Sequence, residues 1–231
     1  MTKTGLYLQD PKYQVRLGGK ADFIRDPSLV FDAPLYKLDG ASFMSKDAYG
    51  HLCTVTGALW TPRGGDFDGS DDKIVIPHHE SLTFTTGDFS IKTWVNLDVL
   101  DSWRGICCKG HWKVHGYGLF INSSNKVQLE INQDGTTQSA ISANTITSGV
   151  WYHLVGTRKG TAAKVYINSE EAGSGVVADP LTTTVNEIIG NRPVGYGYPF
   201  DGLIGEVRIY NRALTPLEIQ HNYLATKWRY R

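Results

Sequence analysis

The chain has 231 residues, and its 23 Lys and Arg side chains balance its 23 Asp and Glu side chains, so the formal net charge is zero. A neutral chain gains little from counterion release or from attraction to acidic lipid, which argues against nucleic acid as the main partner. The 25 Gly and 11% aromatic residues are typical of a domain made of many short strands and tight turns.

Residues 1–28 carry few strong structural signals, and we expect an N-terminal extension that packs on the main domain or mediates assembly. The first ten residues, MTKTGLYLQD, lack the apolar stretch of a signal peptide, so we expect no export signal and leave the localisation open. No apolar run is long enough for a membrane helix, so we expect no membrane insertion.

Strand patterns start at Leu29, and we expect residues 29–231 to form one domain. The segments LVFDAPLYKL and HLCTVTGALW are short and strand-like. In FDGSDDKIVIP, Gly and Asp form a turn before Ile74 and Ile76, which share one strand face. The segment DFSIKTWVNLD alternates, which predicts a half-buried strand with Trp94 on its second face, where the ring needs some cover.

Two hairpins are predicted next. YGLFINSSNKVQLEINQDG reads as two strands around Ser-Ser-Asn, and WYHLVGTRKGTAAKVYINSEEAG repeats the arrangement around Lys-Gly. NEIIGNRP and GLIGEVRIYN add two more strands. About twelve strands at regular spacing, with almost no helical periodicity before residue 214, favour a β-sandwich or a barrel.

The C-terminal segment predicts a short helix that closes the domain. Thr215 can cap the helix, Pro216 suits its first position and Glu218 completes a capping box. Leu217, Leu224 and Trp228 would then form an apolar stripe against the sandwich. We assign four tryptophans to the core, namely Trp60, Trp94, Trp151 and Trp228.

The cysteines do not suggest a disulfide framework. Cys53, Cys107 and Cys108 are odd in number and two of them are adjacent, so we expect reduced, buried thiols. No convincing zinc set is present either. The nearest approach is the pair His78-His79 and the spacing of His111 and His115, and the latter segment reads as a loop.

Eight segments in order carry a family resemblance: FDGSDDKIVIP, TGDFSIKTWV, CKG, GYGLFIN, WYHLVGTRKG, KVYINSEEAGSG, IIGNRP and FDGLIGEVRIYNRALTPLEI. Together they resemble the laminin G-like domains of the concanavalin A-like lectin and glucanase superfamily, which is related to the pentraxins. The match covers about residues 29–224. It implies an all-β fold, a two-sheet antiparallel jelly roll with a concave face and a rim of loops. It does not fix function.

Glycoside hydrolysis needs two carboxylates that face each other across the sugar. Laminarinase-type enzymes of the superfamily carry them on one strand as Glu-x-Asp-x-x-Glu. Here VQLEIN offers Glu130 alone, and Glu170 and Glu171 fall in a turn. We therefore expect no enzyme.

Sugar binding needs aromatic faces for pyranose rings and fixed polar groups for the hydroxyls. Two segments read as loops and carry this mixture, DSWRGICCKGHWKVHGYG and GNRPVGYGYPFDG. In the resembling family such loops lie at the rim or the concave face. The candidate ligand-binding residues are Trp103, His111, Trp112, His115, Tyr117, Asn191, Arg192, Tyr196 and Tyr198.

The resemblance also implies calcium, which the family often binds through carboxylates near a loop. Where many relatives read IDEVRIY, this chain has IGEVRIY, so Gly205 removes one carboxylate. The acids of FDGSDD can instead bond to backbone N–H groups of their own turn. The candidate metal ligands are Asp47, Asp68, Asp71, Asp72, Asp201 and Glu206.

The sequence therefore favours a non-catalytic, lectin-like module whose partner is a glycan or a glycosylated surface. Weak single-site affinity would make a homo-oligomer or array useful. The second hypothesis is an assembly protein, such as a virion surface, decoration or fibre component, and an adhesion role belongs to the same group. A glycoside hydrolase stands third.

Overall fold

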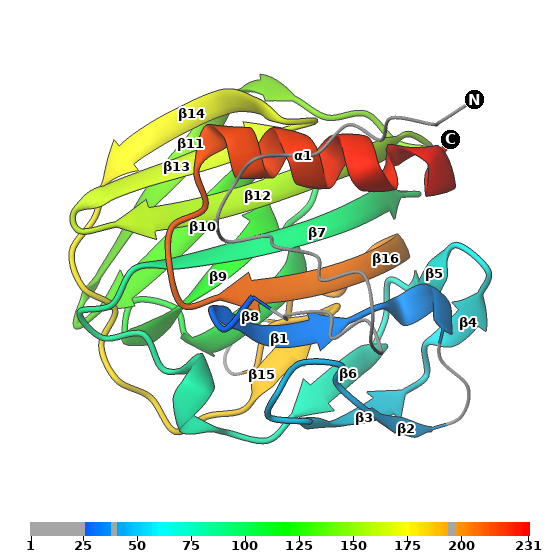
Figure 1. Cartoon of the computed structure of the whole chain (residues 1–231), viewed down its shortest axis with the longest axis horizontal. Coiled ribbons are helices and arrows are strands. Elements are labelled where there is room, and N and C mark those ends of the chain that lie inside the picture. The colour runs from blue at the N-terminus through cyan, green and yellow to red at the C-terminus, as the bar shows by residue number, and fades with distance from the viewer. Residues whose placement is uncertain (1–25, 38–40, 194–196) are drawn as a thin grey trace, which may run out of the picture.

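A computed structural model of the chain describes residues 26–37, 41–193 and 197–231. Within them two antiparallel sheets pack face to face, and one helix crosses the outer surface of the first sheet (Figure 1). The predicted all-β sandwich with a short C-terminal helix is confirmed. Across these residues no helix combines the length and the apolar character that a membrane span requires.

The first sheet has the strand order β14-β13-β12-β7-β16-β5-β4. Strand β1 pairs with the last part of β16, whereas β5 pairs with its first part. The strands of this sheet are β1 (Leu29–Ala33), β4 (Leu59–Thr61), β5 (Gly64–Asp68), β7 (Phe89–Leu97), β12 (Trp151–Lys159), β13 (Ala162–Ile167), β14 (Glu170–Val176) and β16 (Asp201–Tyr210).

The second sheet has the order β11-β10-β9-β8-β15-β6-β3-β2. Its strands are β2 (Ser42–Met44), β3 (Leu52–Thr56), β6 (Lys73–Ile76), β8 (Arg104–His111), β9 (His115–Ile121), β10 (Lys126–Gln133), β11 (Thr136–Thr145) and β15 (Glu187–Ile189). Both predicted hairpins are present, as β9–β10 and β12–β13. The described residues hold sixteen strands, more than the sequence predicts, because several have only three residues. Three short 3-10 helices, η2 (Leu35–Lys37), η3 (Glu80–Leu82) and η4 (Lys227–Arg229), lie outside the sheets.

The hydrophobic core lies between the sheets and follows from the period-two pattern of the strands. In β7, Phe89, Ile91 and Val95 point inward and are fully buried. From the second sheet, Leu119 and Leu129 join the same apolar cluster. The side chains that alternate with these residues are turned to the outer faces, where any charge needs a partner or water.

All three cysteines are free and buried, as the sequence predicts. Burial, followed by the effect of the Glu187 carboxylate, raises the pKa of the Cys107 thiol well above its usual value. Burial likewise raises the pKa of Cys53, to about 12. These thiols stay protonated, and no disulfide links the described residues.

The segment 101–118, which the sequence predicts as a loop, is mostly strand. β8 and β9 pair along their length and only residues 112–114 form the turn. Glycines make the segment resemble a loop, but they are required by close packing. A Cβ atom at Gly110, where φ is +113°, would lie 2.1 Å from the carbonyl oxygen of His115. The loop prediction for this segment is therefore wrong.

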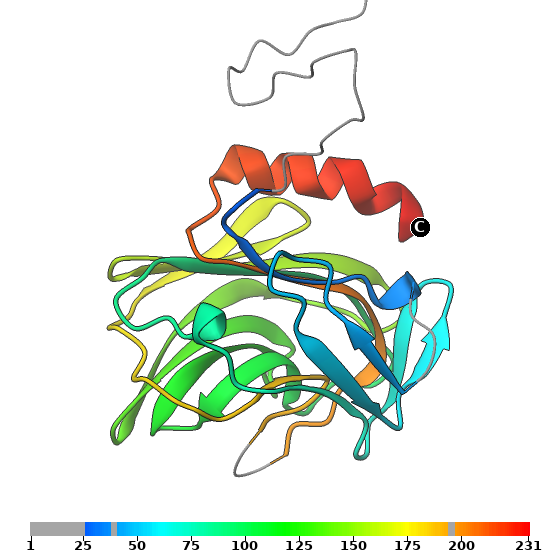
Figure 2. The ribbon, with the colours of Figure 1, turned by 60° about the horizontal axis from the view of Figure 1, so that its bottom comes forward.

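Helix α1 (Pro216–Thr226) begins as predicted. Thr215 Oγ1 accepts the N–H of Glu218, whose carboxylate accepts the N–H of Thr215, so the capping box is complete. Such a box satisfies two backbone donors that helix termini otherwise leave unpaired. The helix lies over the outer surface of β12, β13 and β7 (Figures 1 and 2).

The predicted helix face is wrong. Leu217 and Trp228 are 60% and 62% exposed, and Leu224 is 48% exposed. Instead Ile219 is fully buried and Tyr223 stacks on Trp94 of β7. The helix therefore has a second apolar stripe, which contacts the sheet. Of the four tryptophans assigned to the core, Trp94 is buried at 2% exposure, whereas the core assignment of Trp228 is wrong; Trp60 and Trp151 are partly buried.

The outer face of β7 under α1 holds an ion pair. Lys92 Nζ lies 2.8 Å from Glu206 Oε1, and both side chains are at most 1% exposed. Burial alone would raise the pKa of Glu206, but Lys92 and Arg208 outweigh it and lower the pKa to about 2.

His153 on β12 is fully buried next to Trp94. Burial, reinforced by Lys92, lowers the pKa of His153 well below its usual value, so the ring is neutral.

Replacing His153 by Leu should weaken the acid sensitivity of folding. The unfolded chain takes up a proton on this ring near pH 6.5, roughly, whereas the buried ring does not. Wild-type stability is therefore fully present above that pH and is lost as the pH falls toward the folded pKa, by up to about 1.4 kcal/mol per pH unit.

Urea unfolding between about pH 5.5 and 7.5 measures this slope, with His221→Leu as a control at an exposed position on α1. The His153→Leu protein should have a shallower slope than the control. Equal slopes would show that His153 is not the residue responsible.

Candidate functional site

Strand β10 carries three polar side chains on the outer face of the second sheet. Gln128, Glu130 and Asn132 alternate with apolar residues that point into the core. Their exposed fractions are only 5%, 1% and 1%. A buried carboxylate is costly unless a cation and hydrogen bonds compensate it, so another element has to cover this face.

Arg192, from the loop that follows β15, provides that cover. Its Nη2 donates to Glu130 Oε1 at 2.6 Å, and the two side chains are 2% and 1% exposed. Asn132 Nδ2 donates to the same carboxylate oxygen at 3.0 Å. Removing either partner of such a pair would leave an uncompensated charge in a buried position.

Two aromatic rings lie next to the Arg192 guanidinium, and a third stacks on one of them. The guanidinium carbon lies 5.1 Å from the centre of the Phe120 ring and 5.2 Å from that of Tyr198. Trp103 stacks on Tyr198 with ring centres 5.3 Å apart and planes at 21°. Trp103 and Tyr198 are partly exposed, whereas Phe120 is buried. We call the stacked pair Trp103 and Tyr198 the aromatic wall.

The loop of the aromatic wall is fixed to β8 by hydrogen bonds. Asn191 Oδ1 accepts the N–H groups of Arg192 and Tyr198, at 2.8 and 2.9 Å. Gly105 N–H donates to the Tyr198 carbonyl oxygen at 2.7 Å. A Cβ atom at Gly105 would come within 2.8 Å of the Asn191 backbone, so only glycine permits this approach.

Four of the nine predicted ligand-binding residues therefore meet at one place: Trp103, Asn191, Arg192 and Tyr198. Trp103 and Tyr198 offer ring surface. Arg192 and Asn191 are buried, and the bonds described above direct the Arg192 guanidinium and Asn191 Oδ1 at other protein groups. Arg192 and Asn191 therefore hold the aromatic wall in position.

The remaining predicted residues lie elsewhere. His111, Trp112 and His115 are at the far end of the β8–β9 hairpin, and eight residues of strand separate Trp103 from His111, which is about 26 Å. Tyr117 lies in the interior and donates to Glu187 and to the Leu82 carbonyl. Tyr196 lies outside the described residues.

Sequence reasoning missed Phe120 and considered Glu130 only as a catalytic acid. A usable signal was present in VQLEIN, where polar residues occupy every second position of a strand. Alternation alone predicts a solvent-facing surface, and it does not reveal that Arg192, 62 residues away in the chain, buries that surface.

A family model described as the concanavalin A-like lectin/glucanases superfamily matches residues 68–220, more than half of the chain. The chain belongs to this superfamily. No curated protein sequence matches it.

Three solved structures show the same fold as this superfamily member. Domain 4 of AbnA, an extracellular arabinanase from Geobacillus stearothermophilus, solved with arabinotriose, has a TM-score of 0.68 and 22% identity, covering 84% of this chain and 97% of that domain. The binding domain of Paraclostridial mosquitocidal protein 1 has a TM-score of 0.67 and 14% identity, covering 86% and 52%. The binding domain of botulinum neurotoxin serotype G has a TM-score of 0.68 and 15% identity, covering 86% and 51%. The chain thus spans about half the length of the two toxin binding domains.

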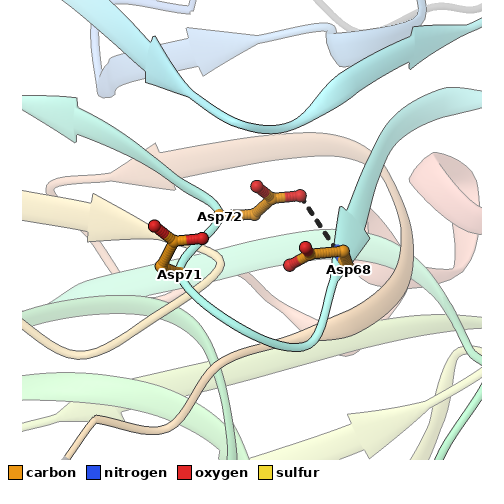
Figure 3. Close-up of side chains that lie close together, drawn as sticks. All are labelled: Asp68, Asp71 and Asp72. Carbon is orange, nitrogen blue, oxygen red and sulfur yellow. Dashed lines mark hydrogen bonds between the residues drawn. The ribbon is translucent and has the colours of Figure 1, made fainter.

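This superfamily member also has a candidate metal site in the turn between β5 and β6. Asp68, Asp71 and Asp72 offer carboxylate oxygens that all lie within 4.8 Å of one another, and Asp72 Oδ2 accepts the N–H of Asp68 (Figure 3). Burial, followed by the charges of Asp68 and Asp71, raises the pKa of Asp72. Three oxygens at this separation suit a hard divalent cation, so the cluster could hold a metal ion.

Asp201, another predicted metal ligand, lies beside this turn. It pairs with Asp68 in the ladder of β16 and β5, and its carboxylate fills the space next to Gly69. Asp66 and Asp98 line an open groove of about 380 Å³ at the same edge. Burial, followed by Asp98 and Asp201, raises the pKa of Asp66, which indicates an electronegative edge.

The last two predicted metal ligands lie apart from this cluster. Asp47 accepts the N–H groups of Asp32, Tyr49 and Gly50 and so organises its own loop. Glu206 is committed to Lys92 under the helix. At position 205 a Cβ atom would lie 2.3 Å from the Tyr230 ring, so an aspartate has no room there in this superfamily member.

Arg192→Ala should destabilise the fold by about 3–5 kcal/mol, because the buried Glu130 carboxylate loses its cation. The double variant Arg192→Met with Glu130→Met should recover most of this loss, since no buried charge remains unpaired. Urea unfolding measures both free energies. If the double variant is as unstable as the single one, packing and not charge pairing determines the cost.

Proposed function

We propose that this chain is a non-catalytic carbohydrate-binding module whose ligand contacts the aromatic wall on the outer face of the second sheet. The observation that carries the proposal is the stacked pair Trp103 and Tyr198, partly exposed and fixed from below by the buried Arg192–Glu130 bridge. Apolar faces of sugar rings pack against such aromatic surfaces, and a preorganised wall loses little entropy when it binds.

The similar structures support a binding role for this fold. The arabinanase domain is in complex with arabinotriose, and the two toxin structures are binding domains. Because identities below 25% carry only the fold, the argument for a glycan rests on the aromatic wall of this chain.

The distribution of carboxylates supports a role without catalysis. Among the strands described for the second sheet, acidic residues occur at Glu130 and Glu187 only. Glu187 faces the interior and accepts hydrogen bonds from Tyr117 and Cys107. Glu130 is held by Arg192 and Asn132. Hydrolysis of a glycoside needs two carboxylates free to reach opposite sides of one bond, and neither residue is available for that.

Trp103→Ala should reduce glycan affinity by about tenfold or more, because truncating a central tryptophan of a binding surface typically costs more than about 1 kcal/mol. The screen is a glycan array that includes arabino-oligosaccharides and sialylated glycans, followed by titration calorimetry on any ligand found.

Trp112→Ala is the matched control, since Trp112 is an exposed tryptophan at the opposite end of β8. Its affinity should equal that of the wild type. Loss of binding in the Trp112→Ala protein with none in Trp103→Ala would move the site to the β8–β9 turn. A folded protein that binds no glycan would count against the proposal as a whole.

We further propose that the metal cluster takes calcium, because its ligands are oxygens of the type that this cation prefers. Calcium at a hundred times its Kd should stabilise the folded chain by about 2.7 kcal/mol, and EDTA should remove this gain. The combined variant Asp68→Asn with Asp71→Asn should lose the response. Asp134→Asn, at an exposed acid in another turn, should retain it. The proposal would be contradicted if calcium did not change the thermal unfolding temperature of the wild type.

A further inference from the structure

Helix α1 is apolar on two sides, but the described residues cover only one of them. Ile219 and Tyr223 contact the first sheet, and Trp94 Nε1 donates to Thr226 Oγ1 from below. The opposite side carries Leu217 and Trp228. A surface helix normally turns a polar face to water, and a helix that is apolar all round is usually buried.

Three exposed apolar side chains lie on the uncovered side. Leu217, Leu224 and Trp228 are 60%, 48% and 62% exposed, and their spacing of seven and four residues places Leu217 and Leu224 of α1 on the same side as Trp228 of η4, which follows directly. The exposed residues Gln220 and His221 lie between Leu217 and Leu224, and the Arg229 guanidinium lies 4.8 Å from the centre of the Trp228 ring. We call Leu217, Leu224 and Trp228 the helix stripe. Three large apolar side chains exposed on one side of a helix are candidates for a contact site.

The described chain begins next to this helix. Asp26 Oδ2 pairs with Arg212 Nη2 at 2.7 Å, and Ser28 Oγ accepts from Arg212 Nε at 2.8 Å. Arg212 also binds Glu218 in the first turn of α1. Residue 26 is therefore attached at the N-terminal end of the helix, and residues 1–25 precede it in the sequence.

The sequence of residues 1–25 suits the stripe in length and in apolar content. The segment reaches up to about 80 Å if extended, whereas the helix is about 16 Å long. It has five basic and two acidic side chains, while the other 206 residues have 18 basic and 21 acidic ones. The basic residues Lys227 and Arg229 lie next to the stripe, so docking would depend on apolar contact and not on charge. Its apolar residues are Leu6, Tyr7, Leu8, Tyr13, Val15, Leu17, Phe23 and Ile24.

We propose that residues 1–25 dock on the helix stripe of their own chain. The occupant is the N-terminal segment because its attachment point is already fixed at the first turn of α1 and its apolar side chains match the stripe. The docked segment would complete the cover of α1 and leave the second sheet, with the aromatic wall, free.

Thiol reactivity in the full chain tests this proposal. The native cysteines Cys53, Cys107 and Cys108 are at most 1% exposed, so a thiol reagent reports mainly on an introduced cysteine. Leu224→Cys probes the stripe, and Leu59→Cys is the matched control, an exposed leucine on β4 (70% exposed). Each rate is divided by the rate of the same protein in denaturant. The thiol at position 224 should react about tenfold or more slowly relative to the control, because a docked segment must open first.

A second set of variants separates the occupants. Replacing Leu6, Leu8, Val15 and Leu17 by Ser in the full chain should accelerate the reaction at position 224 and leave position 59 unchanged. Similar normalised rates at positions 224 and 59 in the otherwise unchanged chain would overturn the proposal. So would protection that rises with protein concentration together with dimers in light scattering, because a second copy would then cover the stripe.

Discussion

The buried bridge between Arg192 and Glu130 is the interaction on which the candidate site depends. It holds a loop from beyond β15 across two strands, and the same guanidinium lies against the rings of Tyr198 and Phe120. In a buried place such a pair contributes orientation more than net stability, since desolvation offsets much of the attraction. The aromatic wall is therefore held in place because the buried Glu130 carboxylate pairs with the Arg192 guanidinium.

Alternation and turn chemistry predicted most of the fold. The period-two pattern of residues 88–98 gave β7 with the correct faces, and the capping box at Thr215 placed the start of α1. The helix face failed because α1 carries apolar residues on two sides, and the pattern alone cannot select between Leu217 and Ile219. The loop prediction for the β8–β9 segment was wrong because its glycines are required by close contact between the two strands and not by turns.

The candidate site was predictable only in part, for a physical reason. Aromatic residues in Gly-rich segments indicated Trp103 and Tyr198, which do stack. Distance along a strand excluded Trp112 from that group, and only strand bounds reveal this. Arg192 and Asn191 were predicted as ligand contacts, but both are buried and bond to other protein groups, so they support the loop. The sequence does not encode this burial directly.

The sandwich has two unlike outer faces. Helix α1, Asp26 and the C-terminus lie on the first sheet, and the loop of Tyr198 lies on the second (Figure 2). A surface or bead joined at Arg231 would therefore lie on the side of the first sheet. The aromatic wall, on the other sheet, would stay open to solvent in such an arrangement.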